Sequence, residues 1–226
     1  MNNQDSSSVK FFLLADSHMK FIRSTFTTPS YDLVTKAIPG LKWIDKYDQK
    51  LSVYALLSLP DIQSSLSQAN AVLFSVGTNS VRIIPATEII SQVQQIVLFI
   101  QQSYPHLNQP EKISISLTFP CFKTTRRFFT ERSLMSNINL YNEKLKLLSS
   151  QMNFNIIDFH ITDSHLANDN MHIQSRFQDR IFNSIINHFN QIIPTTSTTV
   201  TITTEDSNAP LASASQQLQN SYQAEF

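Results

Sequence analysis

The chain has 226 residues, of which 41% are hydrophobic, and this is enough to build one domain with a substantial buried core. Its 17 basic and 17 acidic residues give a net charge of zero, so we expect no strong attraction to nucleic acid or to an anionic membrane surface. The single cysteine, Cys121, excludes an intramolecular disulfide framework. Residues 1–8 lack the apolar segment of a secretory signal, and no apolar run is long enough to span a membrane. We therefore expect a cytoplasmic protein without a transmembrane segment.

Short apolar runs alternate with stretches of helical periodicity along most of the chain. The apolar runs predict five strands, at residues 9–14, 32–38, 71–76, 112–119 and 155–159. The helical stretches predict helices at residues 61–67, 87–104, 134–152 and 173–193. Strands that alternate with helices indicate a parallel sheet covered on both faces, because right-handed crossovers place the helices there. The predicted fold is a three-layer α/β/α, flavodoxin-like domain of about five strands, which occupies residues 9–193.

The two ends of the chain differ in composition from this domain. We expect residues 1–8 to be disordered. From Pro194 onward Thr and Ser dominate without core-forming periodicity, so residues 194–226 are predicted to be a disordered tail or linker. The alternating residues 199–203 could form a strand, but the composition favours disorder. Such a linker would also suit a domain that belongs to a longer protein.

The chain contains only two glycines, Gly40 and Gly77, and both lie just after predicted strands. Glycine serves where the backbone turns sharply or approaches a ligand closely. Another predicted strand ends shortly before Ser17, and Asp169-x-x-His172 precedes the last predicted helix. Ligands of parallel sheets bind at the carboxyl ends of the strands. We therefore expect these segments to form one site at that edge of the sheet.

Serine, histidine and aspartate in these segments indicate nucleophilic catalysis. A serine hydroxyl becomes a good nucleophile when a base takes its proton, and a histidine base needs a carboxylate that fixes its tautomer. Asp169 and His172 are three residues apart, so one turn can present both side chains. Asp169 would hold Nδ1 of His172 while Nε2 faces Ser17. Each residue alone could be a helix cap, a turn residue or a surface histidine, but their joint order and position favour a triad.

These segments, in this order, resemble the SGNH hydrolase family, also called GDSL esterases and lipases. The matching residues are Asp16-Ser17, Gly40, Gly77-Thr78-Asn79 and Asp169-x-x-His172. The resemblance implies that Ser17 is the nucleophile, His172 the general base and Asp169 the orienting acid. It also implies an oxyanion hole built from the backbone N–H groups of Ser17 and Gly40 and the side-chain amide of Asn79. Similar esterase domains are found in some non-LTR retrotransposon proteins.

The chain departs from the family pattern at two positions. Ala15 stands where the family usually has glycine, and it costs about 1 kcal/mol only if the backbone there needs a positive φ. Ser80 replaces an aspartate that commonly braces the loop after Asn79. Neither change removes a predicted catalytic group, so the chain is expected to be a divergent member.

Other polar residues near the motifs have secondary assignments. His165, next to an aspartate–serine pair, is a second-choice base. His18 directly follows the predicted nucleophile and is expected to line the mouth of the substrate site. Asp16 is expected to hydrogen-bond amides of its own loop rather than to act in catalysis.

The resulting prediction is a serine esterase that hydrolyses a small-molecule acyl ester through an acyl-enzyme. No cofactor is expected, and no metal, because no group of histidines and carboxylates has a second ligand set nearby. A nucleotide-binding flavodoxin-like domain is disfavoured, because neither glycine lies in a glycine-rich phosphate loop. The alternative is a catalytically silent binding or assembly module of the same fold, for example in a mobile-element protein. The sequence leaves open the acyl chain, the leaving group and the oligomeric state.

Overall fold

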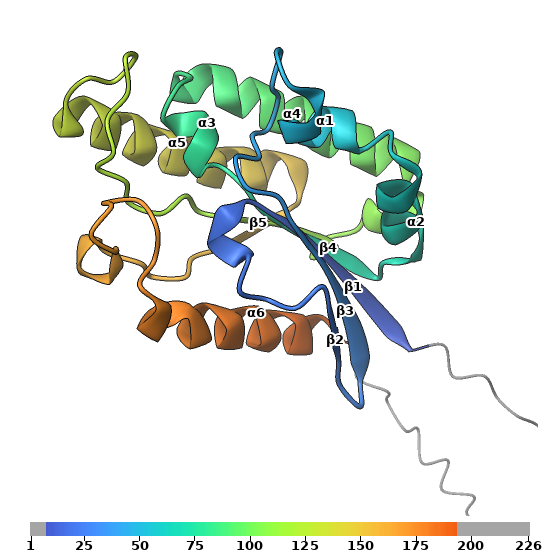
Figure 1. Cartoon of the computed structure of the whole chain (residues 1–226). Coiled ribbons are helices and arrows are strands. Elements are labelled where there is room, and N and C mark those ends of the chain that lie inside the picture. Colours follow the sequence, from blue (N-terminus) through green and yellow to red (C-terminus); the bar gives the residue numbers. More distant parts are fainter. Residues whose placement is uncertain (1–7, 194–226) are drawn as a thin grey trace, which may run out of the picture. The chain divides into compact units, whose positions relative to one another are not determined.

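The structure is a computed structural model that describes residues 8–193 (Figure 1). The predicted disordered ends, apart from Ser8, and the alternating residues 199–203 lie outside the described residues. The described part contains a six-stranded sheet with the strand order β2-β3-β1-β4-β5-β6. The strands are β1 (Val9–Ala15), β2 (Thr25–Thr27), β3 (Tyr31–Ala37), β4 (Ala71–Ser75), β5 (Ile113–Ser116) and β6 (Asn155–Ile157).

The sheet is parallel except at one edge, where β2 runs antiparallel to β3. The five predicted strands are all present, although β5 and β6 are shorter than their apolar runs. β2 was not predicted from the sequence. Its three residues carry a single apolar side chain, Phe26, which is too little to produce a recognisable alternating pattern.

The described residues form six α-helices, of which three lie within three residues of their predicted bounds and two, at residues 53–56 and 78–81, were not predicted. They are α1 (Val53–Leu56), α2 (Pro60–Gln68), α3 (Thr78–Val81), α4 (Ala86–Ser103), α5 (Glu131–Met152) and α6 (Gln178–Ile192). The prediction that the last helix begins at residue 173 is wrong. Ile173 pairs with Leu166 across an isolated bridge, and Ser175–Phe177 form a short 3-10 helix. Ile173 and Phe177 matched the apolar stripe of α6 because they also pack on its side of the sheet, but from the preceding loop.

Two hydrophobic cores lie on the two faces of the sheet, which confirms the predicted three-layer arrangement. In β1, Phe12 and Leu14 face the core formed with α4 and α5, whereas Phe11 and Leu13 face the core formed with α6. This alternation follows from the two-residue period of a strand. Figure 1 shows α6 on one side of the sheet and α1, α2, α4 and α5 on the other. Among residues 8–193, no helix combines the length and the hydrophobicity that a membrane crossing requires.

The strand register brings three chain segments out of the sheet at the same level. Ala15 at the end of β1 lies opposite Ala37 of β3 and Ser75 of β4. The amide of Asp16 continues the ladder by donating to the Ser75 carbonyl at 3.0 Å. The loops after β1, β3 and β4 therefore leave the sheet side by side, at the carboxyl ends of these strands. These are the loops that carry Ser17, Gly40, and Gly77 with its following residues.

Candidate active site

Ser17 begins a short 3-10 helix, Ser17–Met19, that directly follows β1. Asp16 caps this helix, because its side chain accepts a hydrogen bond of 3.0 Å from the His18 amide. This confirms that Asp16 hydrogen-bonds an amide of its own loop. The cap turns the chain sharply at the strand end and leaves Ser17 only 8% exposed at the edge of the sheet.

Asp169 and His172 lie in the loop between β6 and α6, where Asp169 organises the backbone around itself. Its Oδ1 accepts hydrogen bonds from the amides of Met171, at 3.1 Å, and His172, at 2.9 Å. Its Oδ2 lies 2.5 Å from Nδ1 of His172. Asn170 between them adopts a left-handed conformation, with φ of 57°, which asparagine tolerates better than most residues. The turn therefore points carboxylate and imidazole at each other.

The pKa of Asp169 reflects these contacts. Burial alone would raise it, but the hydrogen bonds from the His172 ring and from the amides of His172 and Met171 outweigh burial and lower the pKa to about 2. Asp169 is therefore ionised at neutral pH and can stabilise a positive charge on the neighbouring imidazole. Both side chains of this pair are 40% exposed, so the pair is open to solvent.

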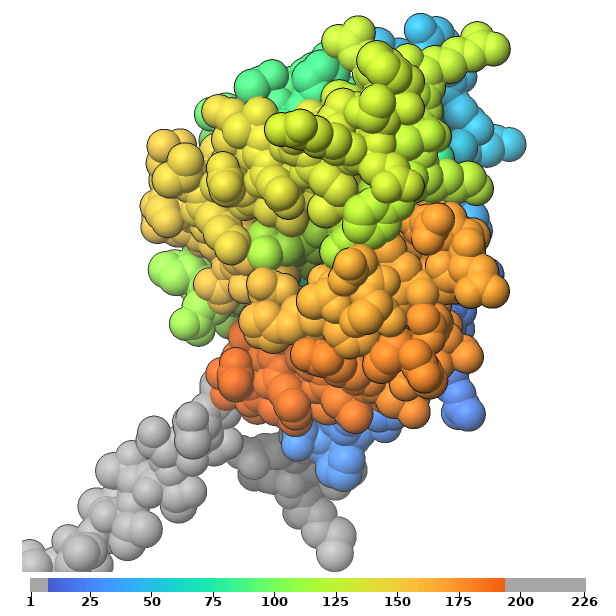
Figure 2. All heavy atoms as spheres, turned by 90° about the vertical axis from the view of Figure 1, so that its left-hand side faces the viewer, coloured from blue at the N-terminus to red at the C-terminus, as the bar shows by residue number. Residues whose placement is uncertain are grey.

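The structure brings the three predicted triad residues together across the sheet edge. Nε2 of His172 lies 3.4 Å from Oγ of Ser17, although the two residues are 155 positions apart in the sequence. This distance is at the long end for a hydrogen bond. Figure 2 shows this side of the molecule, where the segment before α6 lies between α6 and the loop that follows β5.

The predicted oxyanion donors surround the same strand ends. Gly40 has φ of 82°, a left-handed conformation that glycine adopts without strain. Among the hydrogen bonds of residues 8–193, neither the amide N–H of Ser17 nor that of Gly40 has an acceptor. Asn79 is buried, and its Nδ2 donates to the Leu41 carbonyl at 3.3 Å. One N–H of the Asn79 amide thus holds the chain after Gly40 and leaves the other for a ligand.

The two departures from the family pattern have clear structural outcomes. Ala15 lies in extended strand backbone, paired in register with β3 and β4, so a glycine is not needed there. Ser80 takes over a bracing role, because its buried Oγ accepts a hydrogen bond of 3.1 Å from the Trp43 amide. The indole N–H of Trp43 in turn donates to the Tyr141 hydroxyl at 3.0 Å. The loop after β3 is therefore anchored to both α3 and α5.

His165 and His18, the other two histidines that the sequence analysis considered, have different surroundings in the structure. His165 caps its own 3-10 turn: its Nδ1 accepts from the Thr162 amide at 2.9 Å, and its ring packs edge-on against Phe177. It makes no hydrogen bond to Ser17. The prediction that His18 lines the mouth of the substrate site is wrong, because its side chain is buried and only 1% exposed. Exposure of a single residue in a tight turn depends on the loop that packs over it, which the local sequence does not specify.

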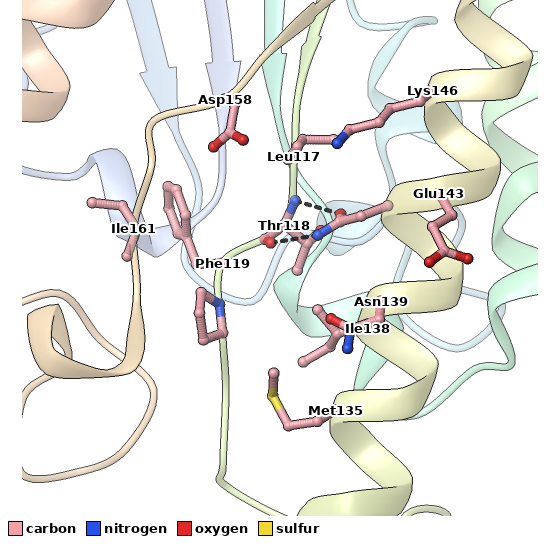
Figure 3. A pocket seen from close by; sticks show the side chains of 12 residues that line it. Leu117, Thr118, Phe119, Met135, Ile138, Asn139, Glu143, Lys146, Asp158 and Ile161 are labelled. Atoms are coloured by element: carbon pink, nitrogen blue, oxygen red, sulfur yellow. Dashed lines mark hydrogen bonds between the residues drawn. The ribbon is translucent and has the colours of Figure 1, made fainter.

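Two hollows of the described residues lie beside the site rather than in it. Figure 3 shows a cavity of about 360 Å³ between α5 and the segments after β5 and β6. On its wall the Asn142 side chain makes two hydrogen bonds of 3.0 Å with the backbone of Thr118. A second hollow has a volume of about 650 Å³, and one of the residues that line it is Lys42, two residues after Gly40. No residue of the triad lines either hollow, and residues 8–193 contain no group of three or more potential metal ligands.

No family model and no curated protein matches this sequence. Solved structures match it at the level of the fold. A GDSL-like lipase from Bacteroides thetaiotaomicron superposes with a TM-score of 0.60 at 10% identity and covers 80% of this chain and 88% of its own. A carbohydrate acetylesterase family member from Sinorhizobium meliloti gives 0.62 at 11% identity, with 82% and 99% covered. A carbohydrate esterase family 3 protein from Talaromyces cellulolyticus gives 0.55 at 17% identity, with 82% and 98% covered.

These similarities extend over nearly the full length of the matched chains and of residues 8–193, but their sequence identities are low. They confirm the three-layer α/β/α fold that the alternation of strands and helices in the sequence predicted. The chain has the three-layer fold of the GDSL-like lipases and acetylesterases.

Proposed function

We propose that this chain is a divergent SGNH-type serine esterase, which hydrolyses a small acyl ester through an acyl-enzyme. The observation that carries the proposal is the line of contacts from Ser17 Oγ through the His172 imidazole to the Asp169 carboxylate. The fold supports it, because the solved structures that share it include esterases and a lipase. Likeness of fold alone does not define the chemistry, so the proposal rests on the residues Ser17, His172 and Asp169.

In the proposed acylation step, Oγ of Ser17 attacks the carbonyl carbon of the ester while Nε2 of His172 takes the hydroxyl proton. Asp169 stays ionised and stabilises the imidazolium through Nδ1. The negative charge that develops on the carbonyl oxygen is received by the N–H groups of Ser17 and Gly40 and by the Asn79 amide. The imidazolium then gives its proton to the leaving alkoxide, which departs as an alcohol and leaves the acyl group on Ser17.

Deacylation reverses the roles with water as the nucleophile. His172 takes a proton from a water molecule, whose oxygen attacks the acyl carbon. The same donors hold the second tetrahedral intermediate. The proton then returns from His172 to Oγ of Ser17 as the carboxylic acid leaves. The exposure of the His172–Asp169 pair is consistent with this step, because water can reach the base directly.

The first test is turnover of p-nitrophenyl acetate and p-nitrophenyl butyrate by the wild-type protein beside the S17A variant. We expect measurable hydrolysis that the S17A substitution abolishes, because Ser17 is the group proposed to form the acyl-enzyme. The control is S30A, which changes an exposed serine in the turn before β3 and should leave turnover unchanged. A folded wild-type protein without turnover would favour the silent binding module, and turnover that survives in S17A would remove Ser17 from the mechanism.

A further inference from the structure

A second aspartate–histidine pair lies directly behind the proposed catalytic pair, and it is buried. His18 is 4% exposed and Asp16 is 2% exposed. Nδ1 of His18 lies 2.8 Å from Oδ1 of Asp16. Nε2 of His18 lies 3.0 Å from the backbone carbonyl oxygen of Met171, which is 153 positions away in the sequence. No step of the proposed reaction uses this pair.

The geometry determines the protonation state of His18. A neutral imidazole carries one N–H, so it can donate to one acceptor only. Both ring nitrogens of His18 face oxygen atoms that accept hydrogen bonds, namely Oδ1 of the Asp16 carboxylate, which also accepts from the His18 amide, and the Met171 carbonyl. The neutral ring would leave one of these contacts as a repulsion between lone pairs in a buried place. Both contacts are satisfied together only when His18 is an imidazolium.

Aromatic rings and titratable groups surround the buried His18 ring. The Phe119 ring packs edge-on against His18, with 5.2 Å between ring centroids, and the His172 ring lies 5.5 Å away. The titratable groups that face His18 are Asp16 on its own segment, and Asp169 and His172 on the loop across from it. Burial works against the charged ring, but the charge and hydrogen bond of Asp16, the Met171 carbonyl and the charge of Asp169 together raise the pKa of His18.

The two contacts of His18 join the two halves of the proposed active site. His18 follows Ser17 in the chain, and Met171 precedes His172. The Asp16–His18–Met171 connection therefore runs parallel to the Ser17–His172 contact, one residue away from it on each side. It fixes how far the loop after β1 lies from the loop before α6.

We propose that His18 is an imidazolium positioning residue that ties the Ser17 loop to the Asp169–His172 loop through Asp16 and the Met171 carbonyl. The effect of His18 on kcat rests on the proposed esterase function, whereas the charge and the contacts of His18 do not. A connection of this kind holds the nucleophile and base at reacting distance, and a displacement of about 1 Å in such a pair can cost about 100-fold in rate. His18 itself touches neither substrate nor the reacting atoms.

The proposed charge and contacts of His18 are tested by nitrogen-15 NMR of the histidine side chains in the full-length wild-type protein, with the His18 ring assigned through its covalent connection to the assigned backbone. We expect the His18 ring to show two protonated nitrogens at about pH 7.5, where an unperturbed histidine is mostly neutral. A neutral pattern, with one protonated and one bare nitrogen, would overturn the proposal. This measurement needs no turnover, so it stands even if the esterase proposal fails.

The effect of His18 on kcat is tested with the variants H18Q and H18F. A glutamine can donate to one acceptor but then turns its carbonyl toward the other, and a phenylalanine donates to neither. We expect kcat to fall about 10- to 100-fold with KM changed less than about twofold, and the rate of fluorophosphonate labelling to fall in parallel. The control is H188Q, which changes another largely buried histidine, one that contacts the Ser114 hydroxyl far along the sheet, and should leave kcat unchanged.

The pH dependence separates a positioning role from a merely structural one. Because the folded pKa of His18 is raised, the connection is intact below its ordinary pKa of 6.5 and is lost as the pH rises through the raised value. The wild type should therefore lose kcat at alkaline pH, and a folded H18Q should lack this decline. Equal kcat and the same pH profile in wild type and H18Q would overturn the proposal. If both variants fail to fold, the NMR measurement on the wild type decides.

Discussion

Among single residues, Asn79 offers the clearest separation of transition-state stabilisation from substrate binding. An oxyanion donor acts on charge that exists only in the transition state, so its removal lowers kcat rather than raising KM. We expect N79A to lower kcat about 100-fold or more, measured with p-nitrophenyl acetate. Because the Asn79 amide also holds the Leu41 carbonyl, thermal unfolding of the variant should be measured alongside. An effect confined to KM would contradict the proposed role.

Gly77 is required by space rather than by an oxyanion function of its own. A Cβ atom added there would collide with the Oγ1 atom of Thr118, which is buried and has no hydrogen-bond partner among residues 8–193. We expect G77A to lower the free energy of unfolding by about 1–3 kcal/mol, as overpacking does. The double variant G77A/T118A should recover part of this loss, because it removes the collision with the hydroxyl, whereas the strain of an alanine at φ of 158° remains. Urea unfolding of both single variants and the double variant measures the coupling, and additive effects would exclude this explanation.

At the residue scale, the sequence was sufficient to predict which residues lie in the candidate site wherever the chemistry demanded a particular residue type. The structure brings Ser17, His172 and Asp169 together as predicted, and their catalytic roles stay predictions. The position of His18 could not be predicted, because its partner carbonyl at Met171 is distant in the sequence and a backbone carbonyl leaves no sequence signal. The only hint was the aspartate two residues before it.

Among the elements, α6 closes one face of the sheet and carries a largely buried titratable group. Nε2 of His188 lies 2.9 Å from the Ser114 hydroxyl of β5, and burial lowers the pKa of His188 to about 4. The unfolded chain takes up this proton as the pH falls below 6.5, whereas the folded chain does so only near pH 4. Stability due to His188 is therefore complete above pH 6.5 and is lost as the pH falls toward 4.

We therefore expect the wild type to lose more unfolding free energy than H188Q between about pH 7 and about pH 5. Glutamine can still accept a hydrogen bond from Ser114 but does not titrate. Urea unfolding at both pH values provides the measurement, and all other titrating groups are common to the two proteins. The same loss in both would mean that His188 is not protonated on unfolding in this range.

Element bounds were predictable where one periodicity dominated and unpredictable where two segments shared a core. α4 has a clean apolar stripe, and its predicted bounds lie within one residue of those observed. The start of α6 was placed too early, because Ile173 packs on the same core from a loop. β2 could not be found, because its pairing depends on the neighbouring β3 rather than on its own three residues.

For the whole molecule, residues 8–193 contain every residue of the candidate site and both of the hydrophobic cores described above. We therefore expect a chain truncated after Ile193 to keep the fold, the midpoint of thermal unfolding and the rate of ester hydrolysis of the full chain. Circular dichroism melting and p-nitrophenyl acetate turnover on both proteins check this. A markedly lower unfolding midpoint for the truncated chain would show that the segment from Pro194 onward contributes to the folded domain.

The most direct test of the proposed triad is to locate the serine that a fluorophosphonate labels covalently. The labelled serine is identified by mass spectrometry of peptides from the full-length protein. Such a reagent reacts with a serine only when a base activates it and an oxyanion hole receives the developing charge. We predict a single adduct on Ser17, absent from S17A and strongly reduced in a folded H172A variant. A folded protein that carries no adduct, or one labelled on a different serine, would contradict the assignment of Ser17, His172 and Asp169 as a working triad.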